Sequence, residues 1–281
     1  MQAVQALKAD FSLSVLLEIA GLPRSTYFSH QARASRPDRH AALDSAIHAV
    51  FTRAKGRYGH RRIHRDLRLR GWGVAKKTVL HRMQVQGLRC QVRRRKRFTT
   101  YRGAVGTTAP NVLNRHFTAA APNQKWVTDL TEFRIGDDKL YVSPVLDLYD
   151  RQVIACSVGR SPTLALATSA LRQAIATLGP TDHPLVHSDQ GFQYQHRSWQ
   201  DLLGAVGATP SMSRKGNCLD NAVIENFFGH LKSEVLLESF ASIDALETAI
   251  TDYIGWYNQE RTSATLNGLS PVQYRAQTFR R

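Results

Sequence analysis

Three acidic residues in the second half of the sequence are candidates for shared chemistry. Asp129 lies in the β-forming run KWVTDLTEFRI, Asp189 closes the short apolar run PLVHSD, and Glu225 lies in the helical run that begins LDNAVIEN. Mg²⁺ is a small cation that prefers oxygen ligands and keeps several waters. Two such ions about 3.5–4 Å apart activate the attacking oxygen and stabilise the leaving oxygen in a displacement at phosphorus. Three converging carboxylates therefore indicate a metal-assisted reaction at a phosphodiester.

Asp129 differs from an ordinary surface aspartate in its surroundings. Most Asp and Glu side chains are solvent-exposed. Asp129, however, stands between apolar and β-forming residues. An unpaired charge there is costly unless a metal or another partner compensates it.

The elements that must position these acids follow from residue 123 onward. Hydrophobic alternation and turn signals predict, in chain order, strands at 125–135, 139–150 and 151–159, a helix at 163–179, a strand at 184–189, a helix at 197–207, a strand at 209–213 and a helix at 219–240. This order is that of an α/β, ribonuclease-H-like fold. In such a fold the first and fourth strands are neighbours, so Asp129, inside the first strand, converges with Asp189. The last helix brings Glu225 over the same point.

Charge divides the chain into two unlike halves. Residues 1–120 carry 24 Lys and Arg against 5 Asp and Glu, a net of +19, whereas residues 121–281 carry 14 against 17, a net of −3. A strongly basic half beside a nearly neutral one is typical of a protein that grips a polyanion with one part and acts with the other. We therefore expect DNA to be the partner of the basic half.

Amphipathic helices dominate that basic half. Apolar residues keep three-to-four-residue spacing, which predicts helices over about 60–70 and 76–86 separated by Gly71 and Gly73, as in helix-turn-helix modules. Upstream, a short apolar helix, a Gly-Leu-Pro turn and a second helix capped by Ser25 resemble half of such a motif. His60 and His64 have the i, i+4 spacing of a metal pair, but the surrounding arginines favour an exposed pair that faces DNA.

We expect four regions along the chain. These are a basic helical DNA-binding region at 1–92, a basic linker at 93–121, a catalytic core at 122–257 and a C-terminal tail at 258–281. The basic residues expected to contact DNA are Arg61, Arg62, Arg65, Lys76, Lys77, Arg93, Arg94, Arg95, Arg214 and Lys215. Three scattered cysteines without CxxC spacing, and no apolar run of about 20 residues, favour a cytoplasmic, nucleoid-associated protein without a membrane span.

The strings around the three acids resemble a known family. WVTDLTEF, HSDQGFQY and NAVIENFFGHLKSE, with 59 and 35 residues between the acids, are similar to the integrase core of insertion-sequence transposases. The nearest resemblance is to the second-frame product (OrfB) of the family called IS-three, which shares this triad with retroviral integrases. GRYGHRRIHRDLRLRGWGVAKKTVLHRM resembles that family's helix-turn-helix region, and WYNQERTSATLNGLSPVQY its tail, although Ser263 stands where the family usually has histidine.

The resemblance implies a DNA transposase that cleaves and joins strands at the ends of an insertion sequence. Asp129, Asp189 and Glu225 would hold Mg²⁺ or Mn²⁺, in all two ions. Water would first free a 3′-hydroxyl, which would then attack a second phosphodiester. Lys232 shares a helix face with Glu225, as does Asn221, and both would contact DNA. The implied partners are element ends, target DNA, the product of an upstream overlapping frame and further copies of the chain.

Two other classes of protein stay open. A ribonuclease-H-like nuclease would use the same metals without needing the basic half. A catalytically silent DNA-binding regulator would need the helix-turn-helix without the three acids. A Ser188–His187 nucleophile is disfavoured, because strand alternation places the two side chains on opposite sides and no GxSxG elbow is present.

Overall fold

The structure is a computed structural model that describes residues 2–34, 40–90, 108–214, 217–237 and 239–278. Arg93, Arg94, Arg95 and Lys215, all expected to contact DNA, lie outside these described residues. The chain falls into two compact units, Met1–Ala49 and Val50–Arg281.

The first unit is helical. It contains α1 (Gln2–Leu7), α2 (Leu13–Ile19), α3 (Arg24–Ala34) and the start of α4 (Ala41–Arg53). The side chains of Val4, Leu16, Leu17 and Tyr27 form its buried cluster. The predicted cap at Ser25 is wrong, because α3 already begins at Arg24 and the N–H of Tyr27 donates to the carbonyl of Pro23 at 3.1 Å.

The predicted pair of helices at the start of the second unit is confirmed. α5 spans His60–Leu69 and α6 spans Lys76–Val85. Their apolar faces bury Ile63, Leu67, Val79 and Met83. Gly71 follows α5 with φ of 86°, a left-handed conformation that ends the helix at little steric cost.

A single mixed sheet carries the rest of the unit. Its strands are β1 (Lys125–Thr128), β2 (Thr131–Ile135), β3 (Asp138–Asp147), β4 (Val153–Gly159), β5 (Leu185–Ser188) and β6 (Thr209–Met212). β1 and β2 pair antiparallel with successive parts of β3, and β4 pairs antiparallel with β3 as well. β5 is parallel to both β1 and β6. The α/β ribonuclease-H-like fold is confirmed, including the predicted contact between the first and fourth strands.

The prediction that Asp129 lies inside the first strand is wrong. The run 125–135 is divided into β1 and β2, and Asp129 and Leu130 form the break between them. The carboxylate of Asp129 accepts the N–H of Leu130 at 2.7 Å, which uses a donor that a continuous strand would give to its neighbour. Asp129 therefore terminates β1, and its side chain is released from the alternation of a strand.

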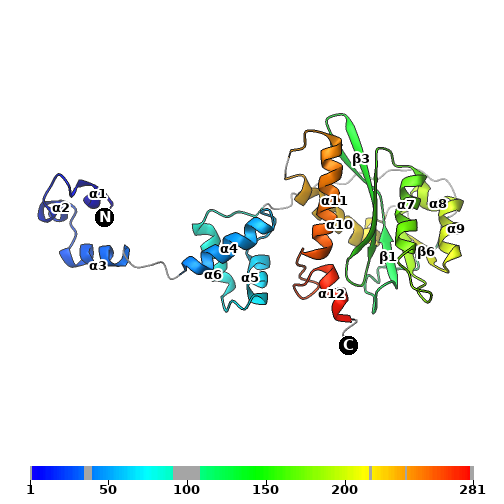
Figure 1. The fold of residues 1–281 in the computed structure, drawn as a ribbon, viewed down its shortest axis with the longest axis horizontal. Coiled ribbons are helices and arrows are strands. Elements are labelled where there is room, and N and C mark those ends of the chain that lie inside the picture. The colour runs from blue at the N-terminus through cyan, green and yellow to red at the C-terminus, as the bar shows by residue number, and fades with distance from the viewer. Residues whose placement is uncertain (1, 35–39, 91–107, 215–216, 238, 279–281) are drawn as a thin grey trace. The chain divides into compact units, whose positions relative to one another are not determined.

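Helices cover both faces of the sheet (Figure 1). α7 (Leu164–Ile175), α8 (Phe192–Gln195) and α9 (Arg197–Ala205) lie on one side, where the core includes Trp126, Leu171 and Trp199. α10 (Ala222–Val235) and α11 (Ile243–Gln259) lie on the other, around Phe227, Ile250 and Tyr253. Both faces are thus buried, as the apolar strands require.

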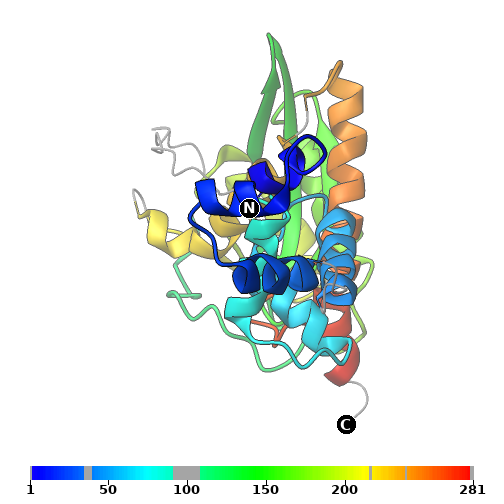
Figure 2. The same ribbon diagram turned by 90° about the vertical axis from the view of Figure 1, so that its left-hand side faces the viewer.

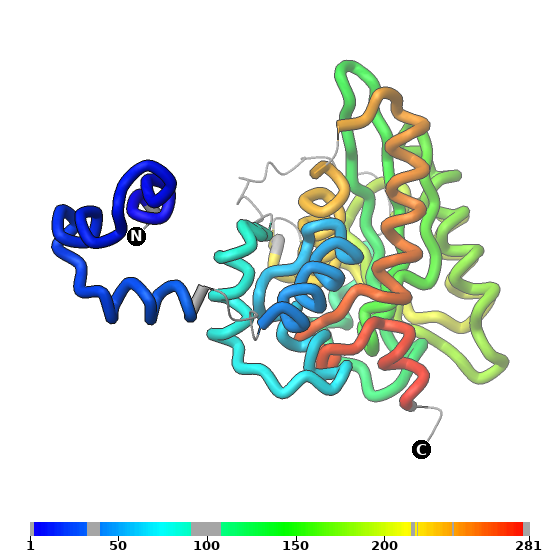
Figure 3. The backbone as a smooth tube through the Cα atoms, turned by 60° about the vertical axis from the view of Figure 1, so that its left-hand side comes forward, coloured from blue at the N-terminus to red at the C-terminus, as the bar shows by residue number. Residues whose placement is uncertain are grey.

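The last helix of the core is shorter than expected. The predicted helix 219–240 consists of a 3₁₀ turn, η1 (Cys218–Asn221), followed by α10, which ends at Val235. α11 contains the predicted boundary at 257, runs alongside β3 (Figure 2) and contacts α12 (Pro271–Thr278), which follows it (Figure 3). No helix among the described residues is both long and apolar enough to cross a bilayer.

Candidate functional site

The ends of two neighbouring parallel strands bring Asp129 and Asp189 together. β1 and β5 pair in the register Val127 with His187, and each aspartate follows its own strand. The pKa of Asp129 is raised well above its usual range, first by burial of its carboxyl and then by the charge of Asp189. The charge of Asp189 thus acts on the buried carboxyl of Asp129, as expected for acids at the ends of neighbouring strands.

Asp189 is held by a tight turn that requires glycine. Its Oδ1 accepts the N–H of Gly191 at 2.8 Å. A Cβ at position 191 would lie 2.9 Å from that same oxygen and 2.9 Å from the Oε1 of Gln193. The Asp-Gln-Gly turn therefore holds the carboxylate of Asp189 in place through the N–H of Gly191. Burial nevertheless leaves the pKa of Asp189 raised.

Glu225 approaches from the first turn of α10. It is partly exposed, and burial raises the pKa of its carboxyl. The charge of Glu225 raises the pKa of Asp129, whereas Lys232, two turns further along the same helix, lowers it. The Nζ of Lys232 lies 5.5 Å from the centre of the Phe133 ring. The charges of Asp189, Glu225 and Lys232 therefore all act on the carboxyl of Asp129.

Asn221 links the start of α10 to the first aspartate. Its Nδ2 donates to the Oδ2 of Asp129 at 3.2 Å. Its Oδ1 is buried without a hydrogen-bond partner among the described residues. Within those residues, no three His, Cys, Asp or Glu side chains are close enough together to hold a metal ion.

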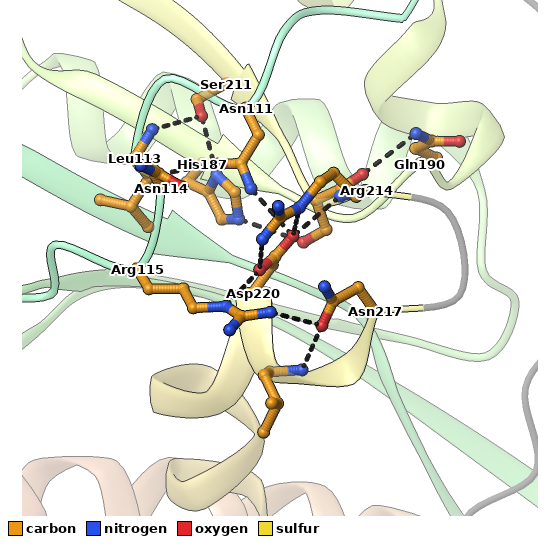
Figure 4. A network of polar contacts seen from close by, with 12 residues as sticks. Asn111, Leu113, Asn114, Arg115, His187, Gln190, Ser211, Arg214, Asn217 and Asp220 are labelled. Carbon is orange, nitrogen blue, oxygen red and sulfur yellow. Dashed lines mark hydrogen bonds and ion pairs between the residues drawn. The ribbon is translucent and has the colours of Figure 1, made fainter.

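A buried ionic network surrounds Asp220, the residue before Asn221 (Figure 4). Asp220 is fully buried and accepts hydrogen bonds from Arg214, Arg115 and Asn111. Arg214 gives Asp220 both its Nε and its Nη2, each at 2.9 Å. Arg214, which the sequence predicts to contact DNA, thus pairs with a buried carboxylate, although 53% of its own side chain is exposed.

Sequence reasoning missed Asp220. An acid just before a helix is usually a simple cap or dipole partner. Its partner Arg115 is 105 residues away, so no local pattern could have shown the pairing.

The predicted DNA contacts on α5 and α6 fall into two groups. Arg61, Lys76 and Lys77 are exposed. Arg62 instead pairs with Glu234 at 3.5 Å, and Arg65 donates to the carbonyl of Ser263 at 3.4 Å. Basic side chains from both groups line a cavity of about 570 Å³ beside residues 262–264.

Three histidine and serine interpretations also have outcomes. His64 is buried and its Nε2 lies 3.0 Å from the carbonyl of Val74, so the expectation of an exposed pair with His60 is wrong. His187 contacts Ser211 at 2.9 Å and Ser213 at 3.1 Å rather than Ser188, which supports the argument against a Ser188 nucleophile. Ser263, at the usual histidine position, contacts Thr265 at 2.9 Å.

Comparison with known families agrees with this architecture. The family described as "Integrase core domain" matches residues 119–218, a second family of the same description matches 225–279, and an "HTH-like domain" matches 38–96. Among solved structures, the catalytic core domain of HTLV-2 integrase in complex with magnesium is similar, with 22% identity, a TM-score of 0.45, and coverage of 56% of this chain and 98% of that one.

Curated relatives extend the similarity to the whole chain. The putative transposase InsK for insertion sequence element IS150 of Escherichia coli is 45% identical over 280 residues, with 99% of each chain covered. The transposase InsF for insertion sequence IS3A, also of Escherichia coli, is 34% identical and covered to 96%, as is this chain. With an integrase core, a helix-turn-helix-like region and relatives matched end to end, the chain belongs to the integrase-core DNA transposases of the IS-three family, enzymes of the polynucleotidyl transferase type.

Proposed function

We propose that Asp129, Asp189 and Glu225 are the catalytic residues of this transposase and hold two divalent ions, Mg²⁺ or Mn²⁺. The observation that carries the proposal is the placement of two mutually repelling carboxylates at the ends of paired parallel strands. A cation between them would offset the free-energy cost of burying their negative charges and the repulsion between those charges. Bound ions would activate the attacking oxygen and stabilise the leaving one.

The donor set fits hard cations. The three proposed ligands are all carboxylates, and carboxylate oxygen is the type of ligand that Mg²⁺ and Mn²⁺ prefer. The unpartnered Oδ1 of Asn221 adds a further neutral oxygen nearby. Glu225 is only partly buried, and its charge already acts on Asp129, so we propose it as the third ligand.

The cationic groups would handle the DNA. Lys232 would neutralise a phosphate next to the three carboxylates, a role supported by the effect of its charge on Asp129. Arg61, Lys76 and Lys77 would contact the phosphates of the duplex, because their side chains are exposed. The same role for Arg93, Arg94, Arg95 and Lys215 rests on the sequence alone.

The partners follow from the family. We propose that the chain acts on element ends and target duplex, in several copies, together with the product of an upstream overlapping frame. Joining two DNA ends to one target takes two strand-transfer reactions, and several copies of the chain would supply an active site for each.

The test is a strand-transfer assay. Element-end DNA labelled at one strand is incubated with the protein, the upstream-frame product and MgCl₂, and the products are resolved on a sequencing gel. Transposition requires joined products in which the freed 3′ end is linked to target DNA. Cut strands that accumulate without any joined product would instead favour the ribonuclease-H-like nuclease. DNA binding without cutting would favour the silent regulator.

A further inference from the structure

Asp220 is the most heavily paired carboxylate in the neighbourhood of the proposed site. Arg115 donates its Nε to Oδ1 at 2.8 Å, and Asn111 donates its Nδ2 to Oδ2 at 2.9 Å. The backbone N–H of Arg214 adds a bond of 3.2 Å to the two that its guanidinium makes. The side chain of Asp220 has no exposed surface, whereas 42% of the Arg115 side chain is exposed. In Figure 4 the two guanidinium groups flank the carboxylate.

The partners of Asp220 are themselves fixed to the sheet. The segment that carries Asn111 and Arg115 is attached to β6, because the N–H groups of Val112 and Leu113 both donate to the Oγ of Ser211 at 3.0 Å. Arg214 follows β6 directly, and the N–H of its neighbour Ser213 donates to the carbonyl of Ser188 at 2.9 Å. The network is therefore anchored next to Asp189.

The other side of the network is the start of α10. Asp220 and Asn221 close η1, and Glu225 lies in the first turn of the following helix. The hydrogen bonds that hold Asp220 therefore also hold the start of α10.

We propose that Asp220 is a positioning residue, which ties the start of α10 to the β5–β6 edge so that Asn221 meets Asp129 and Glu225 is aimed at the two aspartates. The proposal rests on the proposed function, in which Glu225 is a metal ligand. Charge-assisted, bidentate contacts with arginine fix orientation as well as position. A neutral amide at 220 would keep the shape but lose the pull of both guanidinium groups.

A merely structural brace would have a different signature. It would contribute to the free energy of unfolding without changing how the folded protein binds metal. Asp150 is a matched control, since it is also fully buried and paired with an arginine, Arg275. It follows the end of β3 that pairs with the start of β1, whereas Asp129 follows the other end of β1.

The experiment uses the full chain with Asp220→Asn, Arg115→Gln, Arg214→Gln, Asp150→Asn and Glu225→Gln. Cleavage of element-end DNA is followed over a series of MgCl₂ concentrations, Mn²⁺ binding is measured by electron paramagnetic resonance without DNA, and thermal unfolding is recorded. We expect Asp220→Asn to raise the half-saturating metal concentration in both assays by about 10- to 100-fold, the range seen when groups that orient ligands are lost. Each arginine variant should give a smaller rise, and Asp150→Asn none, whatever its melting temperature.

Each other outcome has a defined meaning. Unchanged metal dependence in Asp220→Asn overturns the positioning role. If Asp220→Asn does not fold, the two arginine variants decide, since each leaves Asp220 with one guanidinium, and an unchanged metal dependence in both overturns the role as well. Wild-type cleavage by Glu225→Gln would sink the proposed function itself. An inactive Glu225→Gln beside an Asp220→Asn variant with normal metal dependence would remove only the inference about Asp220.

Discussion

Asn221 donates its side-chain amide to the carboxylate of Asp129 at 3.2 Å, across 92 positions of sequence. This bond joins the residue before α10 to the residue after β1, so the helix that carries Glu225 is registered directly on the first aspartate. The amide uses its donor and leaves its buried oxygen without a partner among the described residues. The bond therefore fixes the start of α10 against Asp129 and leaves the amide oxygen of Asn221 as an acceptor beside that carboxylate.

The three acids should be required for chemistry but not for folding or DNA binding. We expect Asp129→Asn, Asp189→Asn and Glu225→Gln each to lower strand cleavage in MgCl₂ by about 10³-fold or more, because metal assistance is worth several kcal/mol. Gel-shift affinity for duplex DNA should stay close to wild type. Asp201→Asn, which changes an exposed acid on α9, is the control and should cleave normally. A single triad variant with wild-type cleavage would contradict the assignment.

Asp129→Asn should also stabilise the metal-free protein at neutral pH. The pKa of Asp129 is raised in the folded state, so its contribution to stability is present below the unfolded value and is lost as pH rises through the folded pKa. At pH 7 to 8 the raised pKa of Asp129 therefore counts against folding, and an amide, which does not titrate, removes that cost. Scanning calorimetry without divalent ions should show a higher melting temperature for the variant at pH 8, with the difference shrinking towards pH 4. A lower melting temperature at pH 8 would contradict the prediction.

The turn after Asp189 should accept only glycine. Gly191→Ala places a Cβ 2.9 Å from the Asp189 carboxylate, so either the turn or the carboxylate must move. We expect a loss of about 1–3 kcal/mol of unfolding free energy together with impaired cleavage. Gly204→Ala is the control, because it lies in α9 with open space around it, and it should stabilise by about 0.5–1 kcal/mol. Urea titration checks both, and equal effects of the two substitutions would refute the steric argument.

The order of strands and helices in the core could be predicted from hydrophobic alternation, and so could the pairing of the strands that precede Asp129 and Asp189. The break in the first strand could not, because it depends on a carboxylate that takes the N–H of its own neighbour. The Asp220 network depends on Arg115, which local patterns cannot connect with it. Likewise, the contact between the buried His64 ring and the carbonyl of Val74, ten residues further along the chain, could not be predicted from spacing. Position along the chain predicts elements well, whereas side-chain pairing between distant segments needs the folded structure.

The buried ion pair between Glu234 and Arg261 should make the free energy of unfolding depend on pH. Burial would raise the pKa of Glu234, but the hydrogen bonds and charge of Arg261 outweigh it and leave the pKa lowered. The contribution of Glu234 is then present above the unfolded pKa of about 4.3 and lost as pH falls through the folded value. Only 5% of the Arg261 side chain is exposed, so Glu234→Gln leaves a buried charge unpaired and should cost about 3–5 kcal/mol at pH 7.

Urea unfolding at several pH values tests this. The difference between Glu234→Gln and wild type should narrow below about pH 4. Glu247→Gln, at an exposed pair with Arg160, should stay within about 0.5 kcal/mol of wild type throughout. A constant difference for Glu234→Gln from pH 7 to pH 3 would show that the ion pair is not its source.

DNA binding by the full chain should weaken steeply with salt. Each phosphate neutralised contributes about −0.9 to the slope of log affinity against log salt concentration. Replacing Arg61, Lys76 or Lys77 by alanine should each make the slope shallower by about that amount, since their charges are exposed on α5 and α6. Arg197→Ala, with 92% of its side chain exposed on α9, should leave the slope unchanged. Fluorescence anisotropy over a salt series measures the slope for each variant. If all four variants have the wild-type slope, α5 and α6 do not contact DNA through these residues.

The separation of the three acids along the chain also orders events during synthesis. The basic helices α5 and α6 are complete long before α10 leaves the ribosome, and domains commonly fold in the order in which they are made. β1 can pair with β5 only after residue 188 has been made, and Glu225 comes later still. A chain interrupted before α10 would therefore retain the charges for holding DNA but lack the third carboxylate, so a prematurely ended product would occupy DNA without cutting it.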